Sequence, residues 1–227
     1  MPRYRLLLVP LALAIVMLVG CKDPTGLPYN RVHAATLDTF AIPVNNTGNY
    51  TGDVDHYSTG IPIDGSYVTN YQDTIKWGYW ESNSYPYPDQ HGFAMFTVPS
   101  FNSPKGLPTC TLHYYVSGCN GNQSDSILVN NFTPAYWTWG SRSLFKAIDT
   151  STATLAKDAS PTGTGWRKIA LTTQGCGIIA TLGANGGGSL FTGWKYLHSP
   201  ASGWYTRVVG PDVSVSPYIV VVYDPGP

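Results

Sequence analysis

The sequence predicts an all-β fold, a single antiparallel β-sandwich or jelly roll. Residues that favour helix surfaces are scarce, since only 11% of the chain is charged and Glu81 is its one glutamate. Glycine (24), proline (18) and tyrosine (16) are abundant, which favours strands and turns. β-branched and aromatic residues gather in short runs between turn-forming residues, a pattern typical of sandwiches.

The expected strands follow one another along the chain and are separated by Gly, Pro, Asn and Ser clusters. They cover residues 35–42, 73–80, 92–98, 109–117, 125–130, 165–171, 188–197 and 218–223. We expect a hairpin between 109–117 and 125–130, because a turn rich in Gly and Asn joins them. The stretch 43–60 is polar and reads as a connection. A short helix is expected around 144–148 or 177–182.

Side-chain alternation assigns the two faces of the strand 109–117. Cys110, Leu112, Tyr114 and Val116 share one parity, which is apolar and is expected to face the core. His113 and Tyr115 have the opposite parity and should face outward.

The first 21 residues have the layout of an export signal. Arg3 and Arg5 precede an uncharged apolar run, and the run ends in Leu-Val-Gly-Cys21. This ending resembles the lipobox of bacterial lipoproteins, in which the cysteine is lipidated and begins the mature chain. The alternatives are an ordinary signal or a spanning helix, although the run is short for a span and Pro10 interrupts it.

The resemblance implies three segments: a signal peptide (1–20), a lipidated Cys21 with its tether (21–31) and a β-sandwich domain (32–227). The protein would then be lipid-anchored in the cell envelope. Lys22 does not resemble an inner-membrane retention signal of Gram-negative lipoproteins, so the expected location is the outer membrane.

Three further cysteines remain after Cys21. An oxidising compartment favours one disulfide and one free thiol. Cys110 and Cys119 would be about 30 Å apart along an extended strand, beyond disulfide reach. We therefore expect Cys119–Cys176 with Cys110 as a buried thiol, and Cys110–Cys176 is the alternative.

Five segments together resemble a known bacterial family. The chain is similar, in order, to DNRLRE-type domains, which are carbohydrate-binding-module-like jelly rolls of secreted and cell-surface proteins. The matching segments are 35–40 (ATLDTF), 93–99 (FAMFTVP), 109–115 (TCTLHYY), 137–139 (WTW) and 217–223 (PYIVVVY). The resemblance implies a jelly roll and a glycan ligand.

The densest aromatic stretch is the first candidate for such a ligand site. Sugar rings have apolar faces that pack on flat aromatic rings. Trp80, Tyr85 and Tyr87, with Trp77 beside them, could form such a platform. The competing interpretation is that these rings fill the core.

Asp53 and Asp55 are the candidate ligands of a structural calcium ion, which needs six to eight oxygens. A solvated turn is the competing interpretation, and no other cofactor is expected.

The remaining function classes find little support in the sequence. A net charge of zero and the lack of a basic stripe exclude a typical nucleic-acid partner. No nucleophile, zinc or phosphate-loop motif is present, so no catalytic residue is assigned. The sequence favours a non-catalytic binding or adhesion protein. A structural or assembly subunit with a protein partner is the alternative, and a polysaccharide-active enzyme ranks third.

Overall fold

The computed structural model describes residues 37–45, 50–57, 66–72, 74–81, 86–120, 127–131, 140–158, 163–196, 204–209 and 215–226. The expected signal peptide, Cys21 and the tether lie outside these residues. The elements of the described part are β1 (Asp38–Pro43), β2 (Thr51–Tyr57), β3 (Ser66–Tyr71), β4 (Thr74–Glu81), β5 (Pro86–Val98), β6 (Thr109–Asn120), β7 (Ile127–Asn131), α2 (Ser141–Thr150), β8 (Ala153–Asp158), β9 (Gly165–Ala170), α3 (Thr173–Ala184), β10 (Gly188–Tyr196), β11 (Trp204–Val209) and β12 (Tyr218–Tyr223).

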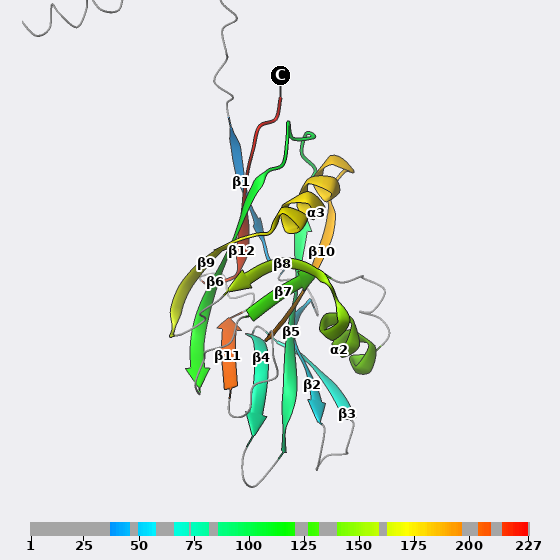
Figure 1. The fold of residues 1–227 in the computed structure, drawn as a ribbon, viewed down its shortest axis with the longest axis vertical. Helices are drawn as coiled ribbons and strands as arrows, with labels where there is room; N and C mark the ends of the chain where they lie inside the picture. Colours follow the sequence, from blue (N-terminus) through cyan, green and yellow to red (C-terminus); the bar gives the residue numbers. More distant parts are fainter. Residues whose placement is uncertain are drawn as a thin grey trace, which may run out of the picture. The chain divides into compact units, whose positions relative to one another are not determined.

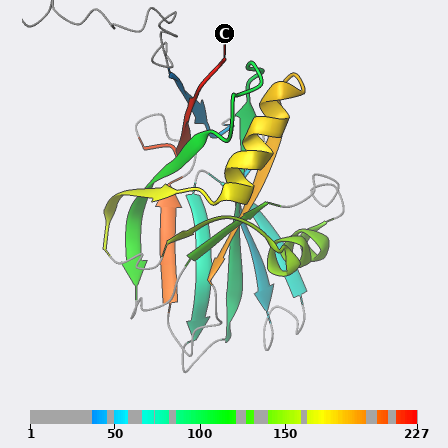
Figure 2. The ribbon, with the colours of Figure 1, turned by 45° about the horizontal axis from the view of Figure 1, so that its top comes forward.

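These strands form a sandwich-like, antiparallel all-β fold, so the predicted fold class is confirmed (Figure 1). The strand order is β1-β12-β6-β11-β4-β5-β10-β7-β8, with β2 and β3 beside β5 and β9 beside β6. The path curls back on itself, because Ala156 of β8 bridges to Leu171, which directly follows β9. Figure 2 shows β7 and β8 crossing in front of the layer that contains β6, β11, β4 and β5.

The two long strands, β5 and β6, organise the sheet. His113 of β6 pairs with β9 on one side and with β12 on the other. Val116 of β6 likewise has β9 on one side and β11 on the other, so β12 and β11 lie end to end along one edge. Gly92 of β5 pairs with both β2 and β10. Each long strand therefore joins several shorter ones.

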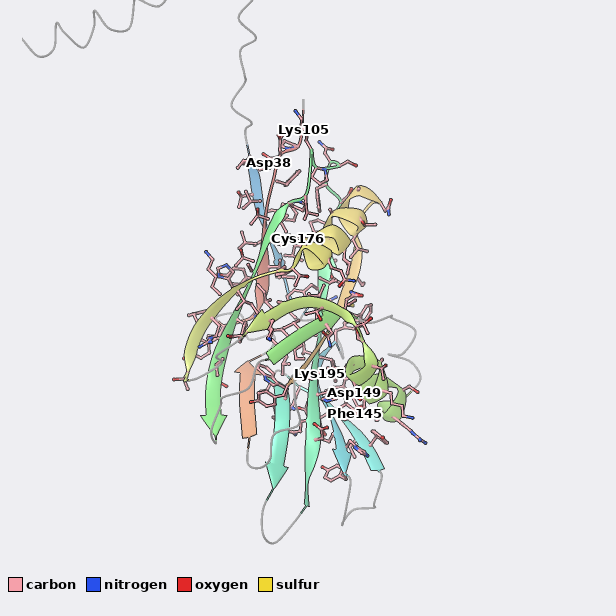
Figure 3. The ribbon with its side chains drawn as sticks, in the orientation of Figure 1. Asp38, Lys105, Phe145, Asp149, Cys176 and Lys195 are labelled. Carbon is pink, nitrogen blue, oxygen red and sulfur yellow. The ribbon has the colours of Figure 1, made fainter. Side chains whose placement is uncertain are left out.

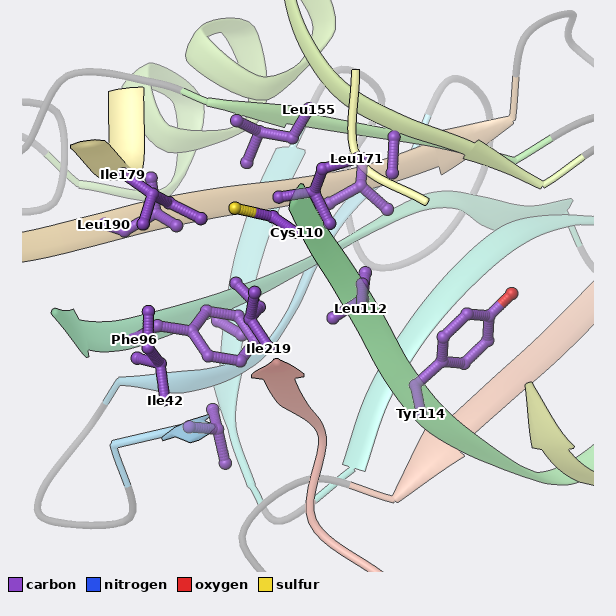
Figure 4. Packing of buried hydrophobic residues seen from close by; sticks show 14 of the residues in the cluster. Ile42, Phe96, Cys110, Leu112, Tyr114, Leu155, Leu171, Ile179, Leu190 and Ile219 are labelled. Atoms are coloured by element: carbon purple, nitrogen blue, oxygen red, sulfur yellow. The ribbon is translucent and has the colours of Figure 1, made fainter. Parts of the chain in front are cut away.

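Side-chain alternation divides the interior into two cores. The larger core takes Phe96 of β5, Leu112 of β6 and Ile219 of β12 (Figure 4). Phe93 and Met95, on the opposite face of β5, pack beneath α2 in the second core. β5 is consequently buried on both faces over much of its length.

Three aromatic rings from different strands meet in the larger core. Trp77 of β4, Tyr114 of β6 and Trp194 of β10 are all fully buried. The Trp77 and Trp194 ring centroids are 5.3 Å apart, and Tyr114 lies 5.3 Å from Trp194, edge to face. Such contacts stabilise beyond the area they bury, by about 1 kcal/mol each.

A buried ionic group closes one side of this core. The Tyr114 hydroxyl donates a hydrogen bond to Asp158 of β8. Arg167 of β9 donates from Nε to Asp158 Oδ2 at 3.0 Å and from its terminal nitrogen to Oδ1 at 2.9 Å. A two-pronged contact of this kind satisfies a carboxylate that is only 5% exposed, and it ties β8 to β9 and β6.

Both helices overlap the two segments that were expected to contain one. α2 buries Leu144, Phe145, Ala147 and Ile148 on the second core. α3 begins at a Thr172 cap, whose side chain accepts a hydrogen bond from the Gly175 amide at 3.0 Å.

The structure corrects two expectations about strands. The predicted hairpin of 109–117 with 125–130 does not form, because β6 pairs with β9, β11 and β12 while β7 pairs with β8 and β10. The polar stretch 43–60, expected to be a connection, contains β2. It escaped detection because its buried side chains include Asp53 and Asp55, which hydrogen bonds satisfy.

Gly92 provides a test of the packing of β4 over β5. A Cβ atom at Gly92 would meet Ile75 and would lie 2.9 Å from the Lys76 carbonyl oxygen. We expect Gly92→Ala to lower the free energy of unfolding by about 3 kcal/mol, because backbone atoms cannot yield as a flexible side chain can. Gly118→Ala in β6, where nothing lies within 4 Å, is the matched control and should cost little. Urea unfolding measures the free energy of unfolding of both variants. Equal losses of stability in the two would contradict the close packing of β4 over Gly92.

Candidate functional site

An open aromatic surface lies on the outer side of β9, β6 and β12. We define the outer aromatic face as Tyr115 and His113 of β6, Trp166 of β9 and Tyr218 of β12. Trp166 is 51% exposed, and the other three rings are half-buried. The expectation that His113 and Tyr115 face outward is therefore confirmed.

The register of the strands places these rings together. Tyr115 pairs with Trp166, and His113 pairs with Tyr218 on the other side of β6. Trp166 lies 5.7 Å from Tyr115 and 5.9 Å from Tyr218 between ring centroids, edge to face in both contacts. The His113 and Tyr218 rings stack at 4.7 Å. Four aromatic rings from three strands thus form one continuous cluster at the surface.

The surroundings of this cluster carry little charge. Lys168, directly opposite His113, is the charged residue that the described parts of β6, β9 and β12 place on this face. The next row along the strands is small, with Ala170, Thr111 and Val220. Burial, together with the charge of Lys168, lowers the pKa of His113 below its ordinary value.

The aromatic residues chosen from sequence do not form this face. Trp77 is fully buried between Tyr114 and Trp194, where a surface ligand does not reach it. Tyr85 lies outside the described residues. The backbones of Trp80 and Tyr87 belong to β4 and β5, but their side chains also lie outside the described part, so a platform built from these rings stays a prediction.

Asp53 and Asp55 lie on one face of β2 and are nearly inaccessible. The Asn70 amide donates to Asp53 at 2.8 Å and to Asp55 at 3.0 Å. Gln72 donates to Asp53, and Gln90 donates to Asp55 at 2.9 Å. Burial raises the pKa of Asp53 to about 7, and the neighbouring Asp55 charge contributes to the rise.

These contacts suit a hydrogen-bonded carboxylate pair better than a calcium site. Lys76 Nζ lies 3.8 Å from Asp53 Oδ1, so a protein cation already faces the more buried carboxylate. A calcium ion would need further oxygen ligands in that position, and an ammonium group offers none. No group of three or more Asp, Glu, His or Cys side chains suited to a metal occurs in the described ranges.

A second acid–base group lies beneath α2. His91 Nε2 is 3.7 Å from Asp89 Oδ1, and the His91 ring stacks on Phe145 at 4.0 Å. Burial lowers the pKa of His91 to about 4 and raises that of Asp89 to about 6. Figure 3 shows Asp149 and Lys195 beside Phe145; their charged groups are 3.4 Å apart. Because Phe145 covers His91, this pair is a poor candidate for catalysis.

The described cysteines correct the expected disulfide. Cys110 and Cys176 are both buried and carry free thiols in the structure, so neither the expected Cys119–Cys176 bond nor the alternative Cys110–Cys176 bond is formed in it. Cys119 lies near the far end of β6, opposite Thr206 of β11, whereas Cys176 is in the first turn of α3.

Comparisons with known proteins leave the family open. No family model matches the chain, and no curated protein matches it either. Among solved structures, the K1 cleaved adhesin domain of Lys-gingipain (Kgp) from Porphyromonas gingivalis W83 is similar over 85% of this chain and 92% of its own, with 12% identity and a TM-score of 0.29. That likeness is too low to establish a shared fold. The resemblance to DNRLRE-type domains stays a prediction.

The described helices include none that is both long and apolar enough to cross a membrane.

The pKa of Asp53 gives a pH-dependent prediction. The unfolded carboxyl loses its proton near pH 3.8 and the folded one near pH 7, so Asp53 makes the protein less stable as pH rises from 4 to 7. Asp53→Asn removes this titration. We expect the free energy of unfolding of the variant, measured relative to that of the parent, to rise by about 3 kcal/mol between pH 4 and pH 8.

Urea unfolding of both proteins at pH 4, 5.5, 7 and 8 measures that gain. Asp89 and His91 titrate in both proteins, so their contributions cancel in the difference. A difference that does not change with pH would mean that Asp53 is not held in a desolvated site.

Proposed function

We propose that this protein is a non-catalytic binding module that takes a polysaccharide chain on the outer aromatic face. The observation that carries the proposal is the half-exposed ring of Trp166, supported on two sides by Tyr115 and Tyr218. Tryptophan, tyrosine and histidine combine flat apolar faces with polar edges, which suits rings that carry both C–H and hydroxyl groups.

The arrangement of the rings favours one kind of glycan. Trp166 is inclined by 74° to Tyr115 and by 62° to Tyr218, so these three rings do not form one plane. A crystalline polysaccharide surface requires a flat platform, whereas a single chain can turn its sugar rings to meet inclined aromatics. Lys168 is the cation on this face, and acidic side chains are missing from the described parts of its three strands. We therefore propose soluble neutral or weakly acidic chains as the ligand class.

The geometry of Asp53, Asp55 and Asp89, among the described residues, supports a binding role over a catalytic one. Glycoside hydrolysis needs two carboxyl groups separated by a space that admits the sugar and water. Asp53 and Asp55 instead share the amide of Asn70, and Asp89 lies beside the covered His91.

The cellular setting is proposed from the N-terminal sequence. A lipid on Cys21 would hold the module at the envelope, in the outer membrane, and residues 21–31 would serve as its tether. A binding face that is open to solvent is compatible with a polymeric ligand outside the cell membrane.

A protein partner is the second candidate. Val220 and Val222 continue the same face over β12, with Ala41 and Thr39 of β1 opposite them. An apolar strip beside aromatic rings is also typical of protein interfaces.

Binding of the full chain to soluble β-glucans, xylans and mannans, and to crystalline cellulose, tests the proposal. We expect binding to a soluble chain, and Trp166→Ala should weaken it about tenfold, equivalent to about 1.4 kcal/mol. Tyr71→Ala is the matched control: Tyr71 is 47% exposed on β3, which both ribbon views place away from β9. The affinity of the Tyr71→Ala variant for the polysaccharide should equal that of the parent.

Two results would contradict this assignment. A folded parent that binds none of the polysaccharides would favour the protein partner. Binding that survives Trp166→Ala but is lost in a Trp80→Ala, Tyr85→Ala variant would place the site on the stretch chosen from sequence. Circular dichroism of each variant separates lost binding from lost folding.

A further inference from the structure

Two buried thiols approach each other where α3 meets β6. Cys110 is 1% exposed and Cys176 is 5% exposed, and both belong to the larger core. One comes from the start of β6 and the other from the first turn of α3.

The backbone around Leu171 fixes their proximity. The Leu171 amide donates to the Cys110 carbonyl oxygen at 2.9 Å, so these two residues are direct cross-strand neighbours. Cys176 Sγ lies 4.0 Å from the Leu171 carbonyl oxygen. Both cysteines therefore contact the same residue.

The side-chain directions agree with this proximity. Figure 4 shows the Cys110 sulfur pointing toward Ile179 of α3 and Leu190 of β10. Ile179 lies three residues after Cys176, and both are on the buried face of α3, one helical turn apart. The Cys110 thiol thus points at the helix face that carries Cys176, which Figure 3 labels at the start of α3.

We propose that Cys110 and Cys176 form a disulfide that ties α3 to β6 when the folding chain meets a disulfide oxidant. The two thiols lose two protons and two electrons and form one S–S bond. The oxidant's disulfide accepts the two electrons and the two protons and becomes two thiols. The reaction takes two successive thiol–disulfide exchange steps. The inference is independent of the proposed ligand.

Burial determines when this bond forms. Burial raises the pKa of the Cys110 thiol well above its ordinary value, and the adjacent Cys176 thiol adds to the rise. Because the thiolate is the reacting species, the docked pair exchanges slowly. The bond forms before α3 docks or while it is transiently open, and is then shielded from reductants.

Cys119 cannot replace either partner in the folded state. β6 runs without interruption from Cys110 to Cys119, which separates them by about 30 Å at 3.3 Å per residue. Cys176 lies beside Cys110, so Cys119 is far outside disulfide reach of both.

Refolding the full chain in a mixture of oxidised and reduced glutathione tests the proposal. The thiols are then trapped by alkylation, and the peptides are analysed by mass spectrometry without reduction. We expect the Cys110 and Cys176 peptides to be joined and Cys119 to be alkylated. Because the bond closes a long loop, it should raise Tm by about 10 °C relative to protein that is refolded in reductant and never forms the bond.

Matched variants sharpen the outcome. Cys119→Ser should keep the joined peptides and the higher Tm of the oxidised over the reduced refolded protein, whereas Cys110→Ala should lose both. Alkylation of Cys110 and Cys176 in the refolded parent, or a bond from either to another cysteine, would overturn the proposal. If Cys110→Ala does not fold, the state of the Cys110 and Cys176 peptides in the refolded parent decides the result.

Discussion

The burial of Tyr114 is the constraint on which much of this structure depends. Its ring packs against both Trp77 and Trp194, and its hydroxyl donates a hydrogen bond to Asp158, so one side chain joins the aromatic core to the ionic group that closes it. Successive side chains of a strand point to opposite faces. Fixing Tyr114 inward therefore forces its neighbours His113 and Tyr115 outward. The inner packing of β6 thus determines where the outer aromatic face lies.

The two buried carboxylates Asp158 and Asp53 follow different electrostatic rules. Asp158 is held between the two nitrogens of Arg167 and the Tyr114 hydroxyl, and these donors offset the cost of removing it from water. Asp53 has amide donors and a more distant lysine, which do not fully compensate for burial, so its pKa rises. The first group is a fixed ion pair. The second changes its charge near neutral pH and makes stability depend on pH there.

Local pattern predicted the strands and faces that depend on neighbouring residues, including the two faces of β6. It could not predict which strands pair, because β6 pairs with β9, β11 and β12, which come long after it in the chain. Trp166 was overlooked as a site residue although a signal was present. In the strand Gly165–Ala170, Trp166, Lys168 and Ala170 occupy every second position, and these positions are exposed. Residues two apart in a strand point to the same face, so the charge of Lys168 indicates that the ring of Trp166 also faces solvent.

The rigidity of the outer aromatic face has a consequence for affinity. Tyr115, Trp166 and Tyr218 stand on strands whose inner faces are packed, so a ligand does not have to order them, and little entropy is lost on binding. The face is nevertheless small, and its few rings on an open surface would bury only part of the proposed sugar chain, which would keep the affinity of one module low. A lipid on Cys21 would compensate, because many copies held on one membrane can engage the same polymer at once. Weak, preformed binding by each copy and strong attachment by the array are therefore consistent with each other.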